Sequence, residues 1–153
     1  MADGTLGDED RETVRSVLLA YARAIDANAV DDATSLFSIN CQVNYALGDM
    51  SILTGRDHLR EHLADTLSRF SATSHHISNI DVTLVGRDTA QSHCYLYAWH
   101  RFPAFPDKPD FEFWGTYSDR LVKADGRWLI ESRRLRMAGK RNMIGRFEPV
   151  ERR

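Results

Sequence analysis

The sequence predicts a cone-shaped α+β barrel, in which N-terminal helices pack on a curved, mainly antiparallel sheet. Two observations support this fold class. Apolar residues up to Phe70 recur at helical spacing, whereas four later runs have the composition and alternation of strands. The turn sequences GRD (86–88) and KADG (123–126) join neighbouring runs, as in a meander of antiparallel strands.

Three helices are expected in the first half of the chain. They cover residues 8–26, 31–37 and 55–70, and the second is expected to begin at a capping aspartate. Residues 41–47 alternate like a short strand. The first helix carries one apolar stripe at steps of four, three and four: Val14, Leu18, Tyr21 and Ile25. Four long strands follow: 74–86, 89–102, 111–123 and 126–137.

The length of 153 residues suits a single domain. We expect residues 11–140 to form it, residues 1–10 to be a flexible N-terminus and residues 141–153 to be a basic C-terminal tail. The formal net charge of -2, from 20 basic and 22 acidic residues, gives no electrostatic reason to expect nucleic acid or a membrane as partner. Without a signal pattern or a long apolar run, the expected location is cytoplasmic.

The two cysteines, Cys41 and Cys94, lack CxxC spacing and have hydrophobic neighbours, which favours buried free thiols over a disulfide or a zinc site. His93 and His100 lie an odd number of positions apart in one strand, so they face opposite sides and cannot share a metal. The chain has no Gly-rich phosphate loop. We therefore expect neither a metal nor another cofactor.

The strand at 91–102 has two faces of different character. One face is mostly small and apolar, includes Cys94, Leu96 and His100, and ends with Phe102; it suits the inside of a cone. The other face is aromatic, with Tyr95, Tyr97 and Trp99, and predicts contact with a second copy of the chain. The expected assembly is a homo-oligomer, either a dimer or a trimer.

The adjacent histidines His75 and His76 begin the preceding strand, so one must face the cone and the other must face outward. Periodicity does not choose between them, because each face of this strand holds one hydrophobic and two polar residues. Asp26 is a second anomaly, since a carboxylate beside Ile25 at the end of an apolar stretch is costly to bury without a partner. From the residues alone, an exposed Asp26 near the helix end is the alternative.

The order of the motifs YARAID, SHHISN and GTYSDRLVKADGRWLIESRR resembles the SnoaL-like branch of the nuclear transport factor two-like superfamily, over nearly the whole chain. That superfamily includes scytalone dehydratase, hexachlorocyclohexane dehydrochlorinase and polyketide cyclases. The resemblance implies a catalytic His75 with Asp26 as its partner, and places Asn79 near them. It also implies a substrate contact for each of three further residues: Tyr45, His100 and Arg133.

The chain departs from scytalone dehydratase at some substrate-binding positions. Ile25 replaces a tyrosine, while Gly115 and Tyr117 stand where that enzyme has small polar residues. Arg133 competes with Arg134 for the inner face, because a bulge in the last strand would exchange them. The substrate is therefore expected to be another small hydrophobic, cyclic molecule, with Cys94 and Leu96 as cavity wall.

A histidine held by an aspartate is a suitable general base for removing a proton from carbon. The resemblance thus predicts a cofactor-independent lyase or isomerase of the dehydratase type. There are two alternatives. One is a non-catalytic protein that binds a small hydrophobic ligand, and the other is a structural oligomerisation module of the same fold.

Overall fold

The computed structural model describes residues 3–45, 52–103, 108–143 and 149–150, with side chains from Gly7 onward. It contains three helices and six strands in these ranges. The helices are α1 (Asp3–Asp26), α2 (Val30–Ser35) and α3 (Arg56–Leu67). The strands are β1 (Phe37–Asn44), β2 (Ile52–Thr54), β3 (Ala72–Gly86), β4 (Thr89–Arg101), β5 (Phe111–Ala124) and β6 (Arg127–Arg141).

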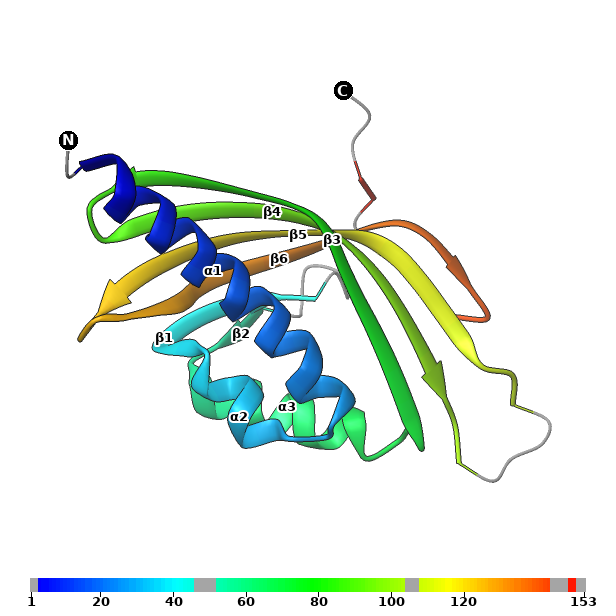
Figure 1. Cartoon of the computed structure of the whole chain (residues 1–153). Coiled ribbons are helices and arrows are strands. Elements are labelled where there is room, and N and C mark those ends of the chain that lie inside the picture. Colours follow the sequence, from blue (N-terminus) through cyan, green and yellow to red (C-terminus); the bar gives the residue numbers. More distant parts are fainter. Residues whose placement is uncertain (1–2, 46–51, 104–107, 144–148, 151–153) are drawn as a thin grey trace.

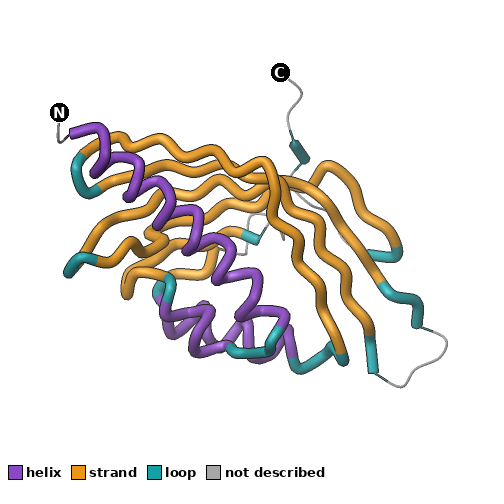
Figure 2. The backbone as a smooth tube through the Cα atoms, in the orientation of Figure 1, coloured by secondary structure: helices purple, strands orange, loops and turns teal. Residues whose placement is uncertain are grey.

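The strands form one mixed sheet in the order β2-β1-β6-β5-β4-β3. Neighbouring strands are antiparallel, except that β1 runs parallel to β6. The sheet is strongly bent, and the helices gather on one side of it (Figure 1 and Figure 2). The predicted α+β fold with a curved, mainly antiparallel sheet is confirmed.

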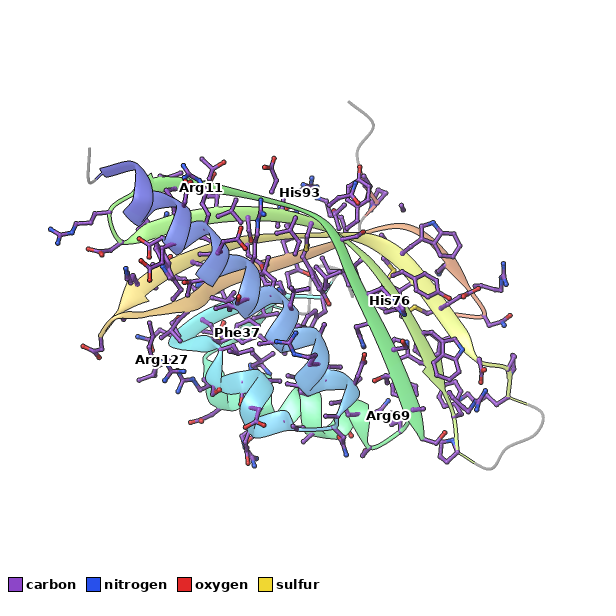
Figure 3. The ribbon with its side chains drawn as sticks, viewed as in Figure 1. Arg11, Phe37, Arg69, His76, His93 and Arg127 are labelled. Carbon is purple, nitrogen blue, oxygen red and sulfur yellow. The ribbon has the colours of Figure 1, made fainter. Side chains whose placement is uncertain are left out.

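The apolar stripe predicted for the first helix is the face of α1 that is buried against the sheet. The four stripe positions of α1, from Val14 to Ile25, are each at most 3% exposed. Phe37, at the start of β1, is fully buried and its ring packs edge-on against Tyr21 at 5.7 Å between centroids. Figure 3 shows Phe37 beneath α1, so the main core lies between this helix and the bent sheet.

The N-terminal boundary differs from the expected one. Helix α1 begins at Asp3, within the segment that was expected to be a flexible N-terminus. Asp10 accepts hydrogen bonds from Lys123 Nζ and Trp128 Nε1, both at 2.8 Å, and these contacts hold the first turns of α1 against the far end of the sheet. The bonds from Lys123 and Trp128 stabilise the charged carboxylate and lower the pKa of Asp10.

Two other local expectations need correction. Helix α2 begins after Ala29 without a side-chain cap, so neither aspartate of that segment caps it. The segment 141–153 is not wholly separate from the domain, because Pro149 pairs with Met137 and Val150 donates a backbone hydrogen bond to Met137 at 3.0 Å. Residues 144–148 and 151–153 of the expected tail lie outside the described residues.

Within the described ranges, no helix has the length and apolar character needed to span a membrane. The cytoplasmic location stays a prediction.

Candidate active site

Strand pairing decides which of the adjacent histidines faces the cone. His75 lies opposite Ala98 of β4, which is fully buried, whereas His76 lies opposite Tyr97, which is 38% exposed. Cross-strand neighbours point to the same face, so His75 faces inward and His76 outward. Figure 3 shows His76 on β3, away from the helices. The side chain of His75 is 8% exposed.

The inward histidine meets Asp26, the last residue of α1. His75 Nδ1 lies 2.7 Å from Asp26 Oδ1, and the backbone N–H of His75 donates to Oδ2 at 2.8 Å. Thr73 Oγ1 donates to Oδ1 at 3.0 Å. Since the carboxylate only accepts, Nδ1 carries the proton, and the Nε2 lone pair remains available.

The position of Asp26 is unfavourable without these contacts. A carboxylate at the C-terminus of a helix faces the negative end of the helix dipole. Burial raises the pKa of Asp26, but the hydrogen bonds and charge of His75, with the bond from Thr73, outweigh burial and leave this pKa below its usual value. Asp26 therefore stays ionised at neutral pH beside an imidazole.

His100, on β4, stands next to this pair. Its ring lies edge-on to His75 at 5.3 Å and stacks on Phe111 at 4.3 Å between centroids. Burial, with a smaller contribution from the charge of His75, lowers the pKa of His100 to about 3, so the ring is neutral. Its Nδ1 is buried without a hydrogen-bond partner in the described structure. An unpaired lone pair is more tolerable than an unpaired N–H, which favours the tautomer with the proton on Nε2.

Two tyrosine hydroxyls meet on the other side of the site. Tyr45, directly after β1, and Tyr21, on α1, form a hydrogen bond of 2.6 Å between their hydroxyl oxygens. Burial raises the pKa of each, and that of Tyr117 on β5 as well. All three side chains therefore remain neutral phenols and can donate or accept hydrogen bonds.

Arg133 lies behind this tyrosine wall. It forms a bidentate ion pair with Asp119, with bonds of 2.9 and 2.7 Å, and both side chains are 1% exposed. The guanidinium carbon lies 4.3 Å from the ring centroid of Tyr21 and 4.1 Å from that of Tyr117. Burial alone would lower the pKa of Arg133, but Asp119 outweighs burial and raises it well above its usual range.

These groups surround a cavity of about 320 Å³, which lies between the helices and the bent sheet. Roughly ten water molecules would fill this volume, so the cavity suits one small ring compound. His75, His100, Tyr45, Tyr21 and Tyr117 line it. Most of the remaining wall is apolar: Ile25, Leu63, Leu67, Phe70, Phe113 and Leu135.

Several predicted site residues do not line this cavity. Cys94 and Leu96 face inward but are buried in the core at 1% and 2% exposure, and burial raises the pKa of the Cys94 thiol to about 11. Arg133 rather than Arg134 is buried, yet it stands behind Tyr21 and Tyr117. Asn79 is exposed, because a bulge after Ser78 shifts the register and gives Asn79 a φ of 51°.

Sequence reasoning missed three residues of the site. Tyr21 was expected only as part of an apolar stripe, and Asp119 was not recognised as the partner of a buried arginine. His62 on α3 also lines the cavity, with its ring stacked on Tyr45 at 5.9 Å. The signal for His62 was its spacing, because it is three positions after Leu59 and next to Leu63, both buried.

Among the described residues, no cluster of three or more histidine, cysteine, aspartate or glutamate side chains could hold a metal ion. Within the part of the chain that the structure describes, His75 and His100 are the only two cavity-lining histidines whose rings contact each other.

Comparison with protein families gives a match to the SnoaL-like domain over residues 8–134. The chain belongs to this family. The match covers most of the chain, including α1 with Asp26, β3 with His75 and the end of the barrel near Arg133. A search of curated proteins found no match.

Solved structures place this SnoaL-like domain among cone-shaped relatives. A provisionally named scytalone dehydratase from Novosphingobium aromaticivorans is 28% identical and superimposes with a TM-score of 0.90, covering 100% of this chain and 99% of its own. A hexachlorocyclohexane dehydrochlorinase, LinA type 2, has a TM-score of 0.80 at 12% identity, covering 95% of this chain and 97% of its own. At that identity, the similarity to LinA concerns the fold.

Proposed function

We propose that this SnoaL-like domain is a cofactor-independent lyase or isomerase of the dehydratase type, which removes a carbon-bound proton from a small, hydrophobic, cyclic substrate. The observation that carries the proposal is the contact of His75 Nδ1 with Asp26 at 2.7 Å: the His75 ring lines a largely apolar cavity, and Asp26, with a side chain 29% exposed, holds the ring from outside that lining. A binding protein or a structural module has no evident need for an ionised carboxylate held against an imidazole.

The proposed base is Nε2 of His75. As Nε2 takes the proton from carbon, the ring becomes an imidazolium, and the adjacent carboxylate of Asp26 stabilises the new charge. The electron pair of the broken C–H bond either moves onto a neighbouring carbonyl oxygen or forms a double bond as a leaving group departs from the next carbon. The proton then returns to a different carbon in an isomerase, or passes to the leaving group or solvent in a lyase.

Two neutral donors in the cavity wall, one beside the base and one across the cavity from it, suit the charge that develops on the substrate. The tautomer of His100 proposed above presents Nε2–H, and the hydroxyl of Tyr45 is a second candidate donor. Such donors stabilise an oxygen that becomes negative only in the transition state. The buried ion pair of Arg133 and Asp119 supports the ring of Tyr21 from behind and does not contact the substrate.

The test uses 2-tetralone, an uncharged bicyclic ketone with acidic protons next to its carbonyl. In D2O at neutral pH, the wild-type protein is expected to exchange these protons for deuterium faster than buffer does, as followed by ¹H NMR. His75→Ala is expected to abolish the excess rate, and Asp26→Asn to lower it by about 10²–10⁴-fold. His76→Ala, a change at the neighbouring outward-facing ring, is the control that should leave the rate unchanged.

Two results would count against the proposal. Exchange no faster than in buffer would favour the alternative of a ligand-binding protein. Exchange that persists in both His75→Ala and Asp26→Asn would mean that another group is the base. The relative described as a scytalone dehydratase supports the dehydratase class, since it matches over almost the full length of both chains.

A further inference from the structure

The cavity has a second polar wall, of which the proposed proton abstraction uses only the Tyr45 hydroxyl. Tyr45 directly follows β1, and α3, which carries His62, packs on β1 and β2. His75 and His100 lie on β3 and β4, at the opposite edge of the six-stranded sheet. We call Asp26, His75 and His100 the base pole. We call Tyr21, Tyr45 and His62 the tyrosine pole.

Helix α1 carries one residue of each pole, so the distance between these two residues along the helix gives the approximate separation of the poles. Tyr21 and Asp26 are five positions apart on this helix, which corresponds to about 7.5 Å along its axis. No ring contact joins His62 to His75 or to His100 within the described residues. The interval between the poles is lined by apolar side chains, including Ile25 and Leu135, and has room for one ring compound.

The ring of His62 has hydrogen-bonding capacity that the protein leaves unused. Its Nε2 makes one long contact of 3.5 Å with the Thr66 hydroxyl, one turn further along α3. Its Nδ1 has no hydrogen-bond partner in the described parts of the chain. The ring lies nearly parallel to that of Tyr45, with 21° between the planes, so its orientation is fixed by packing.

The charges around His62 do not call for an ionic ligand. Burial lowers the pKa of His62. The charge of Asp65 raises this pKa, whereas His58 and Arg69 lower it further, and the net result is a lowered pKa, so the ring is neutral at neutral pH. Arg69 and Asp65, which also line this end of the cavity, form an ion pair with each other. No unpaired charge is therefore left among these residues to balance a carboxylate or a phosphate. A neutral imidazole offers one donor and one acceptor, which suits a carbonyl or hydroxyl group.

We propose that His62 contacts the substrate directly, through a hydrogen bond from a ring nitrogen to a carbonyl or hydroxyl oxygen of an uncharged ring compound. The oxygen binds at the tyrosine pole, beside Tyr45, while the carbon that loses its proton faces His75. The orientation of the substrate rests on the proposed function, but the contact at His62 does not. His62 thereby selects for oxygenated rings over hydrocarbons of the same shape.

The experiment compares the affinities of 2-tetralone and of tetralin, the hydrocarbon that lacks the ketone oxygen, by calorimetric or NMR titration. The variant His62→Phe keeps a ring that can stack on Tyr45 and removes both nitrogens. It is expected to bind 2-tetralone about tenfold more weakly, as for one lost neutral hydrogen bond, and to bind tetralin as the wild type does. His58→Phe, on the exposed face of the same helix, is the matched control and should change neither affinity.

A second readout needs no variant. In a long-range ¹H–¹⁵N spectrum of the wild type, the ring nitrogens of His62 are expected to shift on addition of 2-tetralone and to shift much less with tetralin, while those of His58 stay in place. Unchanged affinity for 2-tetralone in His62→Phe, the same His62 shifts with both compounds, or no saturable binding of the ketone would each overturn the proposal.

The same wild-type sample separates this inference from the proposed function. Deuterium exchange into 2-tetralone reports on His75, whereas the affinity difference between the ketone and the hydrocarbon reports on His62. If exchange occurs without an effect of His62→Phe, only the role of His62 fails. If the affinity effect is found without exchange, only the proposed chemistry fails.

Discussion

Asp26 holds His75 through both oxygens of its carboxylate. Oδ1 lies 2.7 Å from the ring Nδ1, and Oδ2 accepts the backbone N–H at 2.8 Å. One carboxylate thus ties the end of α1 to the start of β3 and also sets the tautomer of the ring. The same contact contributes to the fold and prepares Nε2 as a base, so changes to Asp26 are expected to affect both.

The buried pair of Arg133 and Asp119 should be essential to stability as a pair. Asp119→Asn leaves a buried guanidinium without its counter-charge, and we expect the free energy of unfolding to fall by about 3–5 kcal/mol in urea denaturation. The double variant Arg133→Met with Asp119→Leu should recover much of this loss. Glu131→Gln, in the exposed pair with Arg120, is the control, and its effect should stay within about 1 kcal/mol. Equal effects of Asp119→Asn and Glu131→Gln would contradict this account.

Loss of the hydrogen bond between the hydroxyls of Tyr21 and Tyr45 should lower the free energy of unfolding by less than loss of the Arg133–Asp119 ion pair. Tyr45→Phe removes one of the two hydrogen bonds of the buried Tyr21 hydroxyl, the other being with Arg133, and the free energy of unfolding should fall by about 0.5–1.5 kcal/mol. Tyr95→Phe removes a hydroxyl at a side chain that is 53% exposed and should change the free energy by less than about 0.5 kcal/mol. Thermal or urea unfolding of the two variants measures the difference, and no difference would argue against a stabilising Tyr21–Tyr45 bond.

His100 predicts a loss of stability in mild acid. Its pKa is lowered to about 3 in the folded state from the ordinary 6.5, mainly by burial. Between these values the unfolded chain binds a proton that the folded chain does not, so the free energy of unfolding falls as pH decreases through this window. His100→Phe should reduce the dependence between about pH 5.5 and 6.5, above most of the range in which carboxylates titrate. An unchanged slope in His100→Phe would refute the prediction.

The outer face of the sheet exposes aromatic side chains, so self-association through this face remains a prediction. Tyr95, Tyr97 and Trp114 are 53%, 38% and 39% exposed, and they border a shallow groove on this face. We predict that light scattering coupled to size exclusion gives a mass that is a multiple of 17.5 kDa, and that Tyr95→Arg reduces it. A wild-type protein of 17.5 kDa at micromolar concentration would contradict the prediction.

Much of the architecture could be predicted because its signals are local. The apolar stripe from Val14 to Ile25 and the alternation in residues 89–102 depend on helix and strand geometry alone, and the structure confirms both. The facing of His75 could not be predicted from alternation, because the residues of its strand are balanced in polarity. Pairing with Ala98 decides it, and that contact joins two strands.

The resemblance supplied His75, His100 and Tyr45, which the structure brings to one cavity, but it also supplied Asn79 and Arg133, which do not line it. A bulge at which Asn79 has a positive φ turns this residue away from the cavity. No pattern in the motif SHHISN predicts the bulge. His62 was missed because a histidine on an apolar helical face is usually a core residue. The choice between Arg133 and Arg134 for the inner face was left open. The partner of Arg133, Asp119, is fourteen positions away on the adjacent strand, so their pairing depends on the register of β5 and β6.

The most direct test of the central claim is the tautomer of His75, read from a long-range ¹H–¹⁵N spectrum of the wild type and of Asp26→Asn. The account predicts that Nδ1 carries the proton in the wild type and that Nε2 has the chemical shift of an unprotonated nitrogen. It also predicts that Asp26→Asn changes this pattern while His76 keeps its own. A proton on Nε2 in the wild type, or identical His75 spectra in the two proteins, would contradict the claim that Asp26 orients His75 as the base.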